Sequence, residues 1–120
     1  MAYIEPKAPG FSYGLGTING AGAAGQCVKI NGDNQFAVNT DPTARSFGVL
    51  TKSCKDGEMC GVFCMGGIYE TDQVVGTPAA GDLLACDADT GKLKAADEGD
   101  FPLGETISCQ TGVLRFKLLV

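Results

Sequence analysis

The chain has 120 residues, a formal net charge of −5, six cysteines and no histidine. This length suits one domain with a single hydrophobic core. The acidic balance argues against a nucleic-acid partner, because such binding needs clustered Lys and Arg that neutralise phosphates, and no apolar run reaches the roughly 18 residues of a membrane span. The N-terminus lacks the basic start and apolar run of a secretory signal, so we expect synthesis in a cytoplasm.

Residues 1–24 differ from the rest of the chain and are expected to form an extended arm. Glycines are frequent there, and Pro6 and Pro9 interrupt regular strand pairing. Aromatic and branched side chains lie between them, whereas a disordered tail would lack such residues. The glycines allow a close backbone approach to another surface, and the apolar side chains supply the burial. The alternative is an ordinary first strand that covers the domain's own core.

Residues 25–120 are predicted to form an all-β domain that begins with a hairpin. Residues 27–30 and 35–38 are predicted strands on either side of a turn at Asn31-Gly32-Asp33-Asn34, in which the Asn-Gly dipeptide favours a tight hairpin. Pro42 marks a turn before a strand at residues 46–51, and Gly57 marks another before a strand at residues 58–65. Residues 66–78 are expected to join this half of the domain to the next.

Residues 81–120 predict a second series of strands connected by turns. Strands around residues 84–86 and 93–95 flank a polar turn that ends in Gly91, and strands follow at residues 105–109 and 113–120. Aligning Gly25 with Gly81 matches the apolar and turn positions of both halves. The matched pairs are Ile30 with Cys86, Ala37 with Leu93, Phe47 with Leu103, Gly48 with Gly104 and, after one deletion, Gly57 with Gly112. We therefore expect two related β-meanders packed as a small barrel or sandwich.

The cysteines offer no recognisable catalytic or metal-binding pattern. No pair is separated by the two residues that zinc knuckles and redox motifs use, and histidine is missing from the chain. A catalytic thiol would have only a carboxylate or a lysine as its base, which argues against an enzyme. We expect most cysteines to be reduced core residues. A site built from four cysteines on distant strands stays open as the alternative, and no cofactor is expected.

An acidic run between Asp82 and Asp100 raises the question of calcium binding. Residues 87–91 resemble the start of a calcium loop, but a strand resumes where the loop would have to continue. We expect these carboxylates to form turns and to keep the surface polar.

Several short motifs resemble the small head decoration (capsid cement) proteins of tailed bacteriophages. They are the aromatic, glycine-rich N-terminal segment, the two β-meanders, a turn at Ala80-Gly81-Asp82, a hairpin at residues 88–93, the Leu103-Gly104 entry to a strand, and a final apolar strand. The resemblance implies a β-barrel or β-tulip-like fold without enzymatic activity, assembled as homotrimers, with dimers in some relatives. It places the chain on the outer capsid surface of the virion, where it would bind the major capsid protein and stabilise the shell.

Given this resemblance, the apolar side chains of the N-terminal arm are the expected contacts with the capsid or with a neighbouring subunit. These contact residues are Tyr3, Ile4, Phe11 and Tyr13. Two other functions share the same composition: a tail or fibre structural module, and a small carbohydrate-binding β-sandwich. The second usually stacks sugars on exposed tryptophan, a residue that this chain does not contain.

Overall fold

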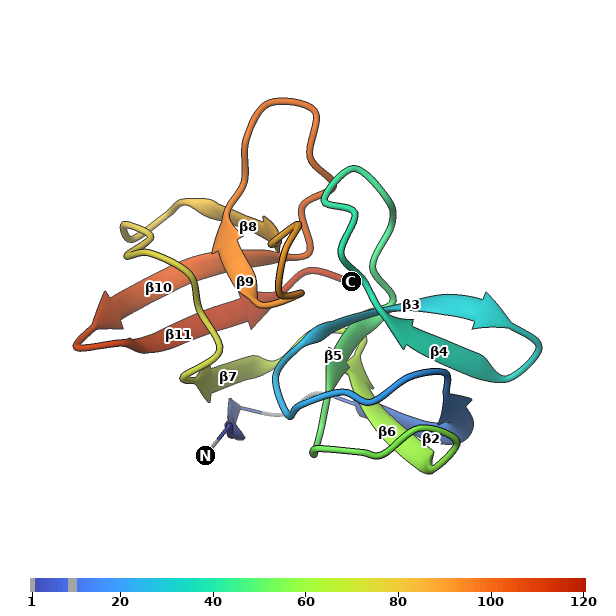
Figure 1. Cartoon of the computed structure of the whole chain (residues 1–120). Coiled ribbons are helices and arrows are strands. Elements are labelled where there is room, and N and C mark those ends of the chain that lie inside the picture. Colours follow the sequence, from blue (N-terminus) through green and yellow to red (C-terminus); the bar gives the residue numbers. More distant parts are fainter. Residues whose placement is uncertain (1, 9–10) are drawn as a thin grey trace.

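The computed structural model describes residues 2–8 and 11–120, with the side chains of residues 11–15 left outside the description. Within this part of the chain the secondary structure consists of eleven β-strands without a helix, which confirms the all-β prediction (Figure 1). Nothing in the described ranges is therefore a helix that could cross a membrane. The strands form two units, one after the other along the chain, and the first strand of the chain is added to the edge of the second unit.

The first unit is a closed barrel of five strands within the described residues. Its strand order is β2-β4-β3-β5-β6, and β6 pairs with β2 to close the barrel. Neighbouring strands are antiparallel, except that β2 and β4 run parallel. The strands are β2 (Phe11–Ile18), β3 (Cys27–Gly32), β4 (Gln35–Val38), β5 (Gly48–Leu50) and β6 (Met59–Cys64).

The second unit is part of a six-stranded sheet with the order β1-β7-β11-β10-β8-β9. Its strands are β1 (Ile4–Ala8), β7 (Ile68–Thr71), β8 (Leu83–Cys86), β9 (Leu93–Ala95), β10 (Gly104–Gln110) and β11 (Val113–Leu118). Beyond β7, an isolated parallel bridge joins Val74 to Leu93 of β9. The Val75 amide donates to the Leu93 carbonyl at 2.8 Å, just as the Asn19 amide donates to the Phe36 carbonyl at 2.8 Å in the first unit. The sheet thus curls toward the closure that the first unit completes.

The two units have the same topology and the same register, which confirms the predicted repeat. Strands β2 to β6 correspond in order to β7 to β11. Equivalent paired residues, first unit then second, are Val28–Gly48 and Leu84–Gly104, Ile30–Phe36 and Cys86–Leu93, and Val49–Phe63 and Glu105–Lys117. One detail of the sequence alignment was wrong, because Phe36 rather than Ala37 is equivalent to Leu93. The segment between the paired residues is one residue longer from Cys86 to Leu93 than from Ile30 to Phe36, which a gapless alignment cannot detect.

Two further segments form strand pairs that the sequence analysis did not assign to them. Residues 66–78 were expected to be a connection, but they contain β7, which pairs with both β1 and β11. Residues 1–24 contain β1 and β2, and both pair with strands of the same chain. Contact of this segment with a neighbouring molecule stays a prediction.

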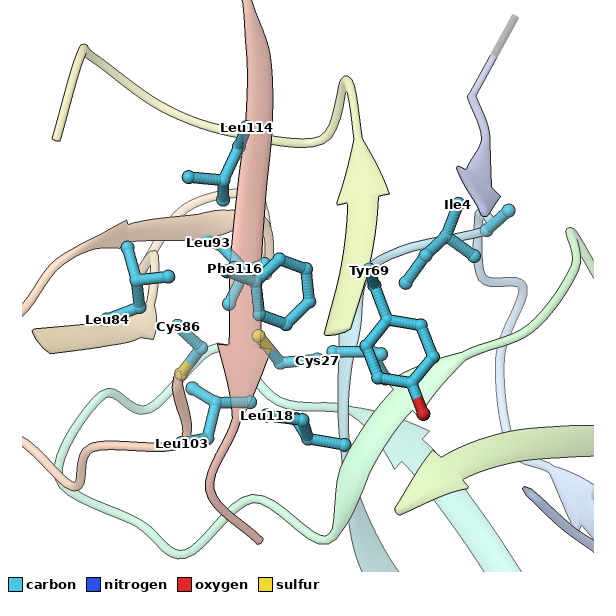
Figure 2. Packing of buried hydrophobic residues seen from close by; sticks show 12 residues of the cluster. Ile4, Cys27, Tyr69, Leu84, Cys86, Leu93, Leu103, Leu114, Phe116 and Leu118 are labelled. Atoms are coloured by element: carbon cyan, nitrogen blue, oxygen red, sulfur yellow. The ribbon is translucent and has the colours of Figure 1, made fainter. Parts of the chain in front are cut away.

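The buried apolar side chains form two clusters. One fills the first barrel and contains Ile18, Val28, Phe36, Leu50, Cys54, Cys60 and Val62. The other fills the second unit and extends beyond it, because Cys27 and Val49 of the first unit belong to it and Phe63 packs against it. Figure 2 shows Cys27 near Phe116, Leu103 and Leu118 of the second unit. The two units therefore share one continuous core at their boundary.

Candidate binding surface

The cysteines are core residues in the structure, as expected. All six are free thiols, five of them buried and Cys109 half-buried. Burial raises the pKa of the Cys27 thiol well above its ordinary value, and it raises the pKa of Cys86 to about 11. Such thiols stay protonated at neutral pH and are poor nucleophiles. Over residues 2–8 and 11–120, no cluster of three or more cysteines and carboxylates has the arrangement of a metal site.

The acidic run forms turns. The Asp87 carboxylate accepts hydrogen bonds from the Thr90 hydroxyl at 2.8 Å, the Thr90 amide at 3.0 Å and the Asp89 amide at 3.2 Å. These bonds, the one from the Thr90 hydroxyl above all, lower the pKa of Asp87. Asp100 has a similar local role, because it accepts from the Lys94 ammonium at 2.8 Å and from the Asp97 amide at 2.8 Å. A carboxylate that fixes its own turn in this way is already satisfied.

The boundary between the units shows how one open end of such a fold is covered. Cys27, Val49 and Phe63 are paired across three neighbouring strands and lie on the outer face of the first barrel; we call them the wall. The wall packs over the open end of the second unit, where the Phe63 and Tyr69 rings lie 4.6 Å apart. Polar bonds secure this contact, since the Cys27 amide donates to the Gly91 carbonyl at 2.8 Å and Gln26 Nε2 donates to the Thr90 carbonyl at 2.6 Å.

The first barrel has an equivalent open end, which we call the mouth and define by Ile30, Phe36 and Phe47. The β3–β4 hairpin, which contains Ile30 and Phe36, projects away from the second unit (Figure 1). A hollow of about 290 Å³ is lined by these three residues together with Gly32, Asn34 and Gln35. An adjoining hollow of about 230 Å³ is lined by Ile30, Phe47 and Arg45. The Phe36 and Phe47 rings lie 5.3 Å apart at its base.

The two open ends differ in what covers them. In the second unit the equivalents of the mouth residues are Cys86, Leu93 and Leu103, and each of them is at most 1% exposed. In the first unit Phe36 is buried and Phe47 is half-buried, but Ile30 is 63% exposed. The position shared by Ile30 and Cys86 is thus surface in the first unit and core in the second. This asymmetry makes the mouth the strongest candidate binding surface on the described part of the chain.

Other large apolar side chains are exposed elsewhere on the molecule. Among the described residues the large ones are Met59, Met65, Val75, Leu83, Ile107 and Leu119. Single exposed apolar side chains are common on protein surfaces and need no partner.

Arg45 adds a positive charge at the edge of the mouth. Its guanidinium lies 5.5 Å from the centre of the Phe101 ring, a cation–π geometry. The Phe101 amide donates to the Pro42 carbonyl at 2.8 Å, so the loops that contain Arg45 and Phe101 are bonded to each other. The charge is held in place at the rim by this contact with the second unit.

The N-terminal residues predicted as contacts lie apart from the mouth or outside the description. Ile4 packs in the second unit's core and is 9% exposed. Tyr3 is half-buried beside β7, where its amide donates to Asp72 Oδ1 at 3.0 Å and its carbonyl accepts from the Thr71 hydroxyl at 2.6 Å. The side chains of Phe11 and Tyr13 lie outside the described residues; their backbone forms part of β2.

Sequence reasoning missed Ile30 and Phe47 as candidate binding residues. Both were assigned to strands from the turn signals beside them, and both were aligned with apolar residues of the second half. The repeat itself is the signal that could have distinguished them. Each unit has an open end that needs a cover, and two units in tandem share only one boundary that can provide it.

Comparison with known proteins gives a likeness of fold. No family model matches the chain, and no curated protein matches it in sequence. Among solved structures, it is similar to the N base of the head fiber protein gp8.5 of bacteriophage phi29, with a TM-score of 0.61 and 13% sequence identity. The match covers 98% of this chain and 94% of the other. At this identity the finding is one of fold: the chain has the fold of that head fiber base along nearly its whole length.

Proposed function

We propose that the chain is a structural protein of a tailed-phage particle that attaches to the outside of the head and stabilises it as a decoration protein. The observation that carries the proposal is the end-to-end fold likeness to a base domain of a phage head fiber. The turn motifs that resemble capsid cement proteins support it independently of that match. The candidate surface is apolar and shallow, which suits contact with another protein.

The proposed partners are the major capsid protein and other copies of the chain, assembled as a trimer. A shell presents the same site many times in a symmetric array, so a weak contact at each site adds up when several copies are linked. The N-terminal residues Tyr3, Ile4, Phe11 and Tyr13 remain proposed contacts between copies or with the shell.

The experiment uses the phage whose genome encodes the chain, grown with and without this gene. Heads from the deletion phage are expected to lack one surface density in electron micrographs and to release DNA at a lower temperature. Adding purified chain back should restore both. Heads that look the same and are equally stable in both preparations would show that the chain is not a head component.

A second role, as the base of a head fibre, is favoured by the same structural match, because the similar protein is itself such a base. The two roles predict different densities in electron micrographs of the heads. A decoration protein is expected to give a short protrusion repeated over the shell surface, whereas a fibre base is expected to lie beneath a long projection. Reconstruction of the restored heads separates them.

A further inference from the structure

We propose that the mouth of the first barrel is the docking site for an apolar β-strand face of the shell protein; this inference rests on the proposed attachment to a phage head. The mouth consists of Ile30, Phe36 and Phe47, with Arg45 at its rim. The occupant is inferred from how the equivalent opening of the second unit is filled.

The second unit supplies the precedent within the same molecule. Its open end is covered by the wall, Cys27, Val49 and Phe63, which are adjacent side chains on one face of three antiparallel strands. Cys86, Leu93 and Leu103 lie in the same cluster as the wall residues Cys27 and Val49, and each is at most 1% exposed. Because the two units share topology and register, the opening of the first unit has a related shape and should accept a related surface.

The mouth has the chemistry that such a contact requires. Its hollow of about 290 Å³ contains two aromatic rings, Phe36 and Phe47, at its base, and Ile30 stands exposed at its side. Aromatic and aliphatic anchors in a preformed hollow are the usual centre of a protein interface, with polar groups at the rim. Arg45 supplies a rim charge, so we expect a carboxylate of the partner beside its apolar face.

A second copy of the chain is disfavoured as the occupant. The residues equivalent to the wall in the second unit are Leu83, Glu105 and Lys117, and all three are exposed. Seating this face in the mouth would remove two charged side chains from water. The free-energy cost of that desolvation exceeds the gain from burying one leucine. Two copies are therefore not expected to repeat the internal contact head to tail, which favours a different protein as the cover.

The test measures binding of purified variants to heads of the deletion phage, by co-sedimentation. The key variant is Ile30→Glu, which places a charge in the mouth at an exposed position and should leave the fold intact. The matched control is Leu83→Glu, which changes a similarly exposed apolar residue on the second unit. Circular dichroism melts of both variants verify folding, and Ile30→Ala provides a milder change.

We expect Ile30→Glu to weaken head binding by about tenfold or more, Ile30→Ala to weaken it less, and Leu83→Glu to bind like the unmodified chain. Equal binding by Ile30→Glu and the unmodified chain would overturn the inference while leaving the proposed function in place. Failure of the unmodified chain to bind heads would instead overturn the proposed function. If Ile30→Glu dissociates an oligomer in sedimentation without heads, the occupant is a second copy and the inference is wrong.

Discussion

Gly48 and Gly104 occupy the same position in the two repeats, and close packing explains why both are glycine. A Cβ at Gly48 would overlap the carbonyl oxygen of Phe63, and a Cβ at Gly104 would lie 3.2 Å from the carbonyl oxygen of Lys117, the equivalent residue. In each unit the glycine lets β5 or β10 approach the neighbouring strand. The requirement is for space, because neither glycine has a positive φ.

Alanine substitution at these two glycines should give graded losses of stability. We expect Gly48→Ala to lower the free energy of unfolding by about 3 kcal/mol or more, since backbone must move, and Gly104→Ala by about 1 kcal/mol. Urea denaturation of both variants measures the difference, and each serves as the control for the other. Equal losses would contradict the packing argument.

Burial of the Cys86 thiol makes stability fall at alkaline pH. Desolvation raises the pKa of Cys86 from 9.0 to about 11 in the folded chain. Between these values the unfolded chain releases the proton and the folded chain keeps it, so unfolding becomes easier as pH rises. Below pH 9 both states hold the proton and the effect vanishes.

Replacement of this thiol tests the alkaline prediction. We expect Cys86→Ala to lower stability at pH 7, because a buried side chain is shortened, and to reduce the further decline between pH 9 and 11. Denaturation under reducing conditions at a series of pH values measures both effects. An identical alkaline decline in the variant and the unmodified chain would assign it to other groups, such as Cys27.

At the scale of elements, the first two strands have different structural roles. β1 lies at the edge of the six-stranded sheet and pairs with β7 alone among the described strands, whereas β2 joins β4 to β6 and closes the first barrel. An edge strand can be lost with less damage than a strand bonded on both sides, because fewer backbone groups lose their partners.

Two deletions distinguish these roles. We expect a chain lacking residues 1–8 to stay folded with reduced stability, since it loses the β1 pairing and the buried Ile4. A chain lacking residues 1–20 should have an open first barrel with exposed amides. Hydrogen exchange at Val62 and Phe36 measures this, and protection of both amides in the longer deletion would contradict the closure role of β2. Head binding by the shorter deletion also shows whether Tyr3 and Ile4 contribute contacts.

For the whole molecule, the shared core predicts that both units unfold together. Cys27 and Val49 of the first unit are fully buried within the second unit's cluster, so neither unit can lose its structure without exposing the other's core. We expect Val49→Ala to lower the stability of both units by the same amount, about 1–3 kcal/mol. The change should appear equally in exchange of amides from the first barrel, such as Val62, and from the second unit, such as Phe116.

The control for this test is a substitution at the exposed residue Leu83. Leu83 is equivalent to Cys27 but is 47% exposed, so Leu83→Ala should change stability little. Different free energies for Val62 and Phe116 in Val49→Ala would show that the units unfold independently.

The sequence by itself determined the strand class, the turns and the repeat. Alternating apolar residues and turn residues act within about ten residues, so hairpins are encoded locally. The β3–β4 turn itself lies at Asp33-Asn34, directly after the Asn31-Gly32 dipeptide. The same local rules operate in both halves, which is why the match of Gly48 with Gly104 was visible without coordinates. β7 was missed because the strand has only four residues and directly follows two glycines, Gly66 and Gly67.

Only the tertiary structure decided which apolar residues are core and which are surface. Ile30 and Cys86 occupy equivalent positions in equivalent strands, yet Ile30 is 63% exposed and Cys86 is 1% exposed. The difference comes from the wall, which is brought over one opening by the packing of two units and has no counterpart over the other among the side chains that the structure describes. Burial depends on what a distant segment places against a residue, and an alternating pattern carries no information about that segment.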